Sequence, residues 1–100
     1  MPRITSLVET GFLSSDSQIT TVTTDVFAVE IAWQNAAIGE NVWLKDTDDG
    51  SDVKETGVVF ATAAGTIQLS WAQGKRFDTG LYLDIGASSG QILVSIQYKT

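Results

Sequence analysis

Hydrophobic residues in this chain recur at every second position, which is the spacing of β-strands. The two clearest runs lie near the C-terminus, over residues 81–85 and 91–99, and their main apolar positions are Leu81, Leu83, Ile85, Ile92, Val94 and Ile96. A period of two places successive side chains on opposite faces, so each run has one apolar face and one mostly polar face. The small residues from Gly86 to Gly90 separate the runs and suit a tight return. The segment therefore predicts a β-hairpin that closes the fold.

Further strands are predicted along the rest of the chain. The clearest one in the first half covers residues 26–34, and one of its faces carries Phe27, Val29, Ile31 and Trp33. Shorter strands are predicted over residues 18–24, 41–45, 54–62 and 67–71. Turns rich in Asp, Ser, Ala or Gly separate them, at residues 14–17, 46–52, 63–65 and 73–74.

This pattern gives about seven to eight short strands and no helical stripe longer than a turn or two. We therefore predict an all-β protein, an antiparallel β-sandwich of jelly-roll-like form. The length is that of one domain, which we place over residues 1–100. Within it, residues 1–17 are predicted to form an extended N-terminal arm.

Charge and composition exclude several classes of partner. The 100 residues carry 12 Asp and Glu against 6 Lys and Arg, a net charge of −6. Because the cations are few and scattered, we expect no nucleic-acid partner. An acidic surface is repelled by anionic lipid and no segment approaches a membrane-spanning length, so we expect no membrane partner. The absence of an apolar signal region near the N-terminus predicts a soluble protein made in the cytoplasm.

Candidate catalytic residues are few. The sequence has no Cys and no His, which removes thiol chemistry, the commonest general base and the commonest zinc ligand. The serines therefore have no evident base to activate them. Ser51 and Lys54 match the SxxK spacing but lie in a turn, whereas that motif needs a helix. We accordingly predict that the protein is not an enzyme and holds no cofactor.

One dense group of carboxylates lies in the turn over residues 46–55, and its members are Asp46, Asp48, Asp49, Asp52 and Glu55. Carboxylate oxygens are the ligands that Ca²⁺ prefers. The EF-hand spacing fails, however, because Ser51 falls where that loop needs Gly when Asp46 is taken as its first position. We favour a solvated acidic turn and leave Ca²⁺ binding open.

The aromatic residues divide into two groups. Four of them are in phase with the aliphatic faces of their strands and are predicted to lie in the core: Phe27, Trp33, Trp71 and Tyr98. Trp43 and Tyr82 are out of phase with their apolar neighbours and are predicted to point away from the core. Exposed aromatic side chains are enriched at protein interfaces and also stack on sugars. Trp43 and Tyr82 are therefore our candidate partner-interface residues, with packing under a loop or against the N-terminal arm as the alternative.

The C-terminal half resembles a group of known proteins. The residues that carry the resemblance are Arg76, Phe77, Gly80, Leu81, Tyr82, Leu83 and Asp84, preceded by the run AAGTIQLSWA and followed by a glycine-rich turn and a last strand. This arrangement is similar to that of small structural proteins of tailed bacteriophages. The likeness covers residues 40–99.

The resemblance implies a virion component, foremost a capsid cement (decoration) protein, made in the host cytoplasm and located in the virion. Such a protein would bind the major capsid protein or other virion subunits as a symmetric dimer or trimer, without an active site. Two alternatives stay open. One is a head-fibre or tail accessory subunit, and the other is a carbohydrate-binding β-sandwich in which Trp43 and Tyr82 would meet the sugar.

Overall fold

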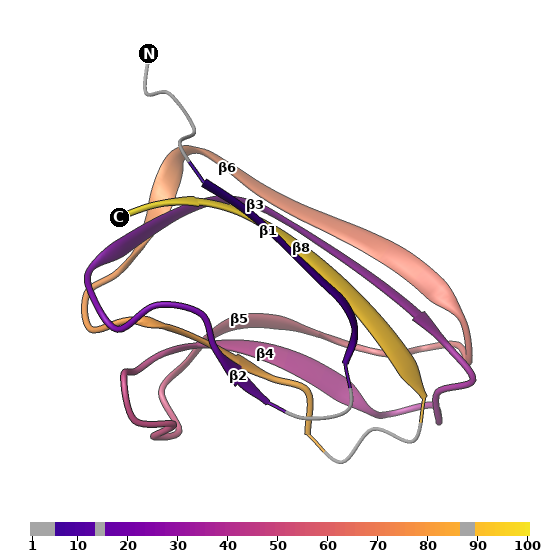
Figure 1. The fold of residues 1–100 in the computed structure, drawn as a ribbon. Coiled ribbons are helices and arrows are strands. Elements are labelled where there is room, and N and C mark those ends of the chain that lie inside the picture. The colour runs from indigo at the N-terminus through magenta and orange to yellow at the C-terminus, as the bar shows by residue number, and fades with distance from the viewer. Residues whose placement is uncertain (1–5, 14–15, 87–89) are drawn as a thin grey trace.

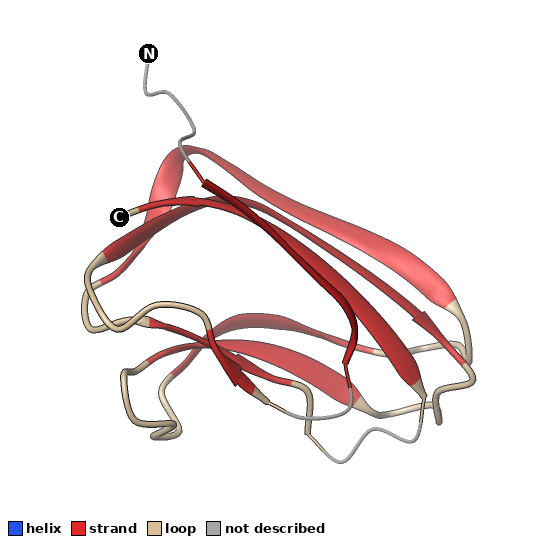
Figure 2. Cartoon of the chain, viewed as in Figure 1, coloured by secondary structure: helices blue, strands red, loops and turns tan. Residues whose placement is uncertain are grey.

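The computed structural model describes residues 6–13, 16–86 and 90–100. Within these ranges the chain consists of strands and loops without a helix (Figure 2), so no helix there is long and apolar enough to cross a membrane. The strands are β1 (Ser6–Leu13), β2 (Ser17–Gln18), β3 (Thr24–Gln34), β4 (Asn41–Asp46), β5 (Lys54–Val59), β6 (Gly65–Phe77), β7 (Leu81–Asp84) and β8 (Gln91–Lys99).

The described strands form two antiparallel four-stranded sheets that pack face to face (Figure 1). The upper sheet has the order β1-β8-β3-β6 and the lower sheet has the order β2-β7-β4-β5. The first strand therefore pairs with the last, the second with the seventh, the third with the sixth and the fourth with the fifth. This nested pairing is that of a jelly roll. The predicted fold class is confirmed.

The segment that we predicted to be an extended N-terminal arm contributes to both sheets. Ser6–Leu13 forms β1 at the edge of the upper sheet, where it pairs with β8. Ser17–Gln18 forms β2 at the edge of the lower sheet. Residues 1–5 and 14–15 lie outside the described residues.

The predicted C-terminal hairpin is wrong. Its two strands are real, but β7 belongs to the lower sheet and β8 to the upper sheet. Both strands have a fully buried apolar face. Two such faces are removed from water when they pack against each other across the sandwich. β7 and β8 therefore do not pair with each other. Residues 87–89, between these two strands, lie outside the described residues.

The core fills the space between the sheets. Its buried apolar members among the described residues are Val26, Val29, Ile31, Ala36, Val42, Leu44, Phe60, Phe77, Leu81, Leu83, Ile85, Ile92, Val94 and Ile96. Trp33, Trp71 and Tyr98 are partly buried and pack against it, and the ring of Trp33 stacks on Phe60 at 4.4 Å between centroids. Core packing of these three aromatic residues was predicted from their phase.

Phe27 does not join this core, so its predicted position is wrong. On β8 the partners of Val26 and Ala28 are the consecutive residues Tyr98 and Gln97, which leaves Phe27 as an extra residue on β3. A bulge of this kind shifts the period of two by one position. Val26 and Val29 consequently both point inward and are fully buried.

The predicted turn at residues 73–74 is also wrong, because β6 continues through it. Opposite Phe27, the register of β6 jumps from Ser70 to Lys75, so four residues of β6 bulge out of the ladder. Gly74 has a φ of +83°, which glycine adopts without strain. A Cβ there would lie 3.2 Å from the ring of Phe27. The glycine marks a bend within a strand and not its end.

The predicted strand over residues 18–24 is mostly a loop. Its threonine hydroxyls bond to nearby groups: Thr24 Oγ1 donates to Val22 O at 2.8 Å and contacts Thr20 Oγ1 at 2.6 Å. Such local bonds compete with a sheet ladder. The Gln18 amide Nε2 fixes the loop from β2, because it donates to the carbonyl oxygens of Thr20, Thr47 and Leu81 at 2.6, 2.7 and 3.2 Å.

The alternation in β8 gives a direct test of the core. Val94 is fully buried and Leu93, beside it on the outer face, is 36% exposed. Val94→Asp should lower the free energy of unfolding by several kcal/mol, because it buries an unpaired charge. Leu93→Asp should cost far less. The two are compared by urea denaturation, and equal losses would contradict this assignment of faces.

Candidate functional site

The outer face of the lower sheet carries both predicted interface residues. On β4, Val42 and Leu44 point into the core and Trp43 points outward; on β7, Leu81 and Leu83 point inward and Tyr82 outward. Trp43 lies opposite Asp84, and Tyr82 opposite Lys45. Trp43 and Tyr82 are thus diagonal neighbours on adjacent strands. Both are partly buried, and their role in an interface stays a prediction.

Lys45 lies at the centre of this outer face. It is 7% exposed, and no other charged side chain whose burial the structure describes is buried. Its ammonium Nζ lies 2.6 Å from Asp84 Oδ2 and 3.3 Å from Asp52 Oδ1. The hydrogen bond to Asp84 raises the pKa of Lys45, against the effect of burial. Burial disfavours the Asp84 carboxylate, yet its bond to Lys45 holds the pKa of Asp84 below its ordinary value.

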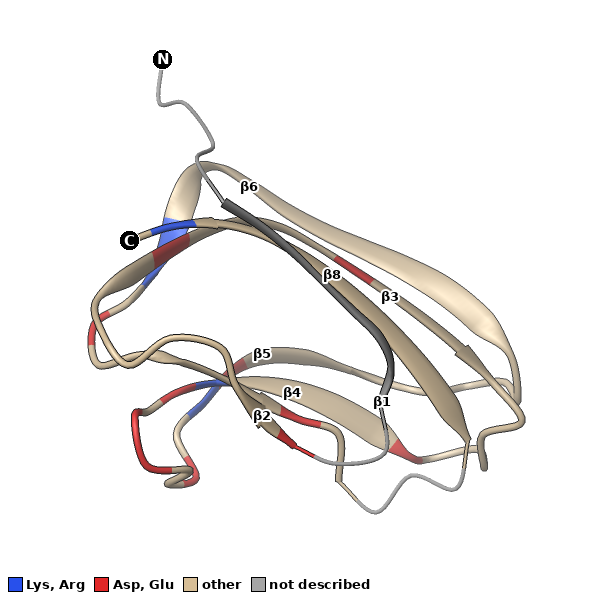
Figure 3. Ribbon diagram, viewed as in Figure 1, with Lys and Arg blue, Asp and Glu red and all other residues tan. Residues whose placement is uncertain are grey.

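A second lysine extends the network toward Trp43. Lys54 Nζ lies 3.2 Å from Asp52 Oδ1 and 5.6 Å from the centre of the Trp43 ring, a cation–π distance. The Asp52 carboxylate thus links two ammonium groups, and its hydrogen bonds to Lys54 and Lys45 lower its pKa. Figure 3 shows these charges gathered on the lower sheet and the adjoining turn.

The indole of Trp43 approaches the backbone of the neighbouring strand closely because residue 57 is glycine. Gly57 is the direct cross-strand partner of Trp43. A Cβ on Gly57 would lie 2.6 Å from Trp43 Cε3 and 2.3 Å from the backbone oxygen of Val42, which no side chain tolerates without a shift of the backbone. The ring therefore contacts both the bare backbone of β5 and the ammonium group of Lys54.

Tyr82 contacts the acidic turn through its ring and Asp16 through its hydroxyl. A Cβ on Gly50 would contact the Tyr82 ring at 3.6 Å, so the turn packs on the ring. The phenol donates to Asp16 Oδ2 at 3.3 Å, and burial together with the negative charge of Asp16 raises the pKa of Tyr82. Packing under a loop, the alternative reading of this residue, therefore accounts for part of its environment.

Four of the five carboxylates of the acidic turn contact protein groups, and the five do not converge. Asp46 accepts backbone N–H bonds from Asp78 and Thr79 at 3.0 and 2.8 Å. Asp49 Oδ1 accepts from the Ser51 and Thr47 hydroxyls at 2.5 and 2.7 Å, which lowers its pKa to about 2. Asp52 binds the lysines. In the part of the chain that the structure describes, no three His, Cys, Asp or Glu side chains come close enough to hold a metal ion.

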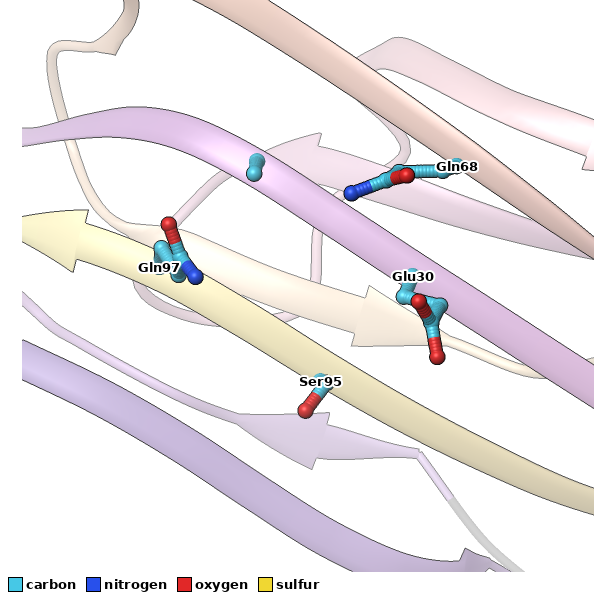
Figure 4. A pocket seen from close by; sticks show the side chains of 5 residues that line it. Glu30, Gln68, Ser95 and Gln97 are labelled. Atoms are coloured by element: carbon cyan, nitrogen blue, oxygen red, sulfur yellow. The ribbon is translucent and has the colours of Figure 1, made fainter.

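A shallow depression of about 110 Å³ lies on the outer face of the upper sheet (Figure 4). Its lining residues, on β3, β6 and β8, are Ala28, Glu30, Gln68, Ser95 and Gln97. One carboxylate, two amides and a hydroxyl can exchange hydrogen bonds with a polar ligand. They supply no base–nucleophile pair, and Ser95 has neither a Lys nor a second acid in the lining to activate it.

Sequence reasoning found the two aromatic residues of the lower sheet but missed the groups that hold them. Lys45 and Gly57 carried no motif. Their signal was positional, since Lys45 shares the outward phase of Trp43, and a glycine inside a strand often marks close backbone approach. Chemically, this surface offers two partly buried aromatic rings beside paired charges.

No protein-family model, no curated protein and no solved structure matches this chain. The resemblance to phage structural proteins therefore stays a prediction.

The central ion pair gives a test of how much Lys45 contributes to stability. Lys45→Met keeps the aliphatic stem but leaves Asp84, whose side chain is 17% exposed, without its cation. We expect a loss of about 2–4 kcal/mol in the free energy of unfolding. Lys54→Met, at a side chain that is 45% exposed, should cost less than about 1 kcal/mol. The free energies of unfolding of both variants are measured by urea denaturation at neutral pH. Equal losses would contradict a larger contribution of Lys45 than of Lys54 to stability.

The acidic turn gives a test by pH. The folded-state pKa of Asp49 is about 2, below the ordinary value of 3.8. The charged carboxylate therefore stabilises the fold at pH values above the ordinary pKa of 3.8. This contribution to stability is lost as the pH falls through the folded-state pKa of about 2. Asp49→Asn should be less stable than the wild type at pH 7, and the difference should shrink as the pH falls below 3.8 and vanish below about pH 2. A difference that does not change with pH, or an equal one in Asp48→Asn at the exposed neighbouring position, would contradict this account.

Proposed function

We propose that this protein is a structural component of a tailed-phage virion, a capsid cement protein that binds the assembled head lattice and stabilises it. The observation that carries the proposal is the outer face of the lower sheet, where Trp43 and Tyr82 are held in place by the Lys45 network. Aromatic anchors that are already ordered lose little conformational entropy on binding. Such a surface suits a protein that acts by contact.

The segment that resembles phage proteins has structural roles in this fold. Phe77, Leu81 and Leu83 are fully buried. A Cβ on Gly80 would lie 2.7 Å from Thr20 O and 2.9 Å from Thr47 O, so this corner requires glycine. Asp84 holds Lys45. The segment therefore encodes the corner between β6 and β7 and the site's central ion pair. The virion role is our proposal from the resemblance of its sequence.

Binding, and not catalysis, is the activity we propose. The chain has no His or Cys, and the carboxylates of the acidic turn that have partners bond to backbone N–H groups, hydroxyls and lysines. A subunit that binds the assembled lattice but not free capsid subunits makes disassembly less favourable by mass action. Several weak contacts from a symmetric oligomer would add by avidity.

The experiment uses capsids that lack this protein, prepared from the phage that encodes it. Wild-type protein should co-sediment with them and raise their temperature of disruption. Trp43→Ala should weaken binding at least about tenfold, because it removes a central anchor. Gln97→Ala, on the outer face of the other sheet, is the matched control and should bind normally. Absence of binding would refute the cement role, and binding to purified tails alone would favour a tail accessory subunit.

A carbohydrate-binding module is the second candidate, because aromatic rings beside paired Asp and Lys side chains also suit a sugar. It predicts a change in tryptophan fluorescence on titration with a glycan panel, with and without Ca²⁺, that is lost in Trp43→Ala. A flat response would remove this candidate without affecting the first.

A further inference from the structure

We infer that two copies of this chain associate through the free edge of β6, with the two β6 strands antiparallel about a two-fold axis at Gln68. The inference concerns the isolated protein and does not depend on the proposed virion role. It rests on the openness of this edge, on its lack of charge and on its self-complementary sequence.

The edge is long and open. Among the strands that the structure describes, β6 (Gly65–Phe77) pairs with β3 alone and ends its sheet. In Figure 1, β6 and β5, the last strand of the other sheet, lie along the same flank of the sandwich, away from β1 and β2. An edge strand presents a row of backbone N–H and C=O groups that another strand can pair with.

Natural edges are usually protected by charge, proline or bulges, and the first half of β6 has none of these. Residues 56–74 are the longest stretch of the sequence without Asp, Glu, Lys or Arg, and they contain no proline. Figure 3 shows β6 uncoloured except at its end, where Lys75 pairs with Glu55 and Arg76 with Asp25. The bulge follows Ser70, so residues 65–70 form a regular, unprotected ladder.

Lack of charge favours a second copy as the partner. Two chains that each carry a net charge of −6 repel each other over most of their surfaces. Two neutral edges meet without a like-charge pair. The opposite edges fit this role less well, because β2 has two residues and β1 includes Glu9.

The sequence of the ladder is self-complementary about Gln68. An antiparallel pair centred there sets Thr66 opposite Ser70 of the second copy and Ile67 opposite Leu69. Thr66, Gln68 and Ser70 are exposed, whereas Ile67 and Leu69 are half-buried. Polar residues of the two copies thus lie opposite each other on the outer face of the sheet. The half-buried Ile67 and Leu69 lie opposite each other on the face that packs toward the core. Each copy contributes the same surface, as a two-fold interface requires.

The test compares two double variants at the same positions. Thr66→Lys/Ser70→Lys places lysines opposite each other at both pairs, and Thr66→Lys/Ser70→Glu places each lysine opposite a glutamate. Cross-strand pairs of like charge destabilise and pairs of opposite charge stabilise. Their oligomeric states are measured by light scattering after size exclusion and by analytical ultracentrifugation. Circular dichroism checks that both variants fold.

The wild type and the Lys/Glu variant should be dimers, and the Lys/Lys variant should dissociate at least about tenfold more readily. Gln91→Lys/Gln97→Lys makes the same change of net charge on β8 and should leave the dimer intact. A monomeric or trimeric wild type, an unchanged dimer in the Lys/Lys variant, or equal dissociation of the two double variants would overturn the inference. A dimer that fails to bind capsids would refute the cement role alone, and a monomer that binds them would refute this inference alone.

Discussion

The structure depends on the contact between two apolar sheet faces. Leu81 and Leu83 of one sheet and Ile92, Val94 and Ile96 of the other are fully buried, and the favourable free energy of folding comes mainly from removing such surface from water. A sandwich of this size has one core layer and no spare interior. Trp43, Tyr82 and the paired charges around Lys45 therefore lie outside this core, on the outer face of the lower sheet.

Among the residues whose burial the structure describes, Lys45 is the one buried charged side chain. Its environment follows from the packing of the outer face. Lys45 points outward from β4 but is covered by its neighbours, and its contacts with Asp84 and Asp52 offset the cost of desolvation that burial of an ammonium group brings. The network links β4, β7 and the turn before β5. Trp43 and Tyr82 consequently lie beside fixed ion pairs, and both remain only partly buried.

The sequence allowed prediction of what depends on local alternation. Most of the strands, the inward face of β8 and the outward orientation of Trp43 and Tyr82 followed from a period of two. Strand pairing did not, because residues 86–90 look the same whether they join two strands of one sheet or cross between sheets. Phe27 was misplaced since a bulge changes the phase without a sequence signal of its own. The lysine network was missed because its members are close only after β4 and β7 pair.

One end of the sandwich illustrates how loops become part of the folded body. The Asp46 carboxylate accepts hydrogen bonds from backbone amides of the β6–β7 corner, and the Gln18 amide bridges three separate segments. Opening this corner therefore also requires the hydrogen bonds to Asp46, at the end of β4, to break. The amide protons of this corner should exchange with deuterated solvent in one cooperative event together with those of the adjoining strands. A region of irregular backbone would then be protected from exchange as strongly as the sheets.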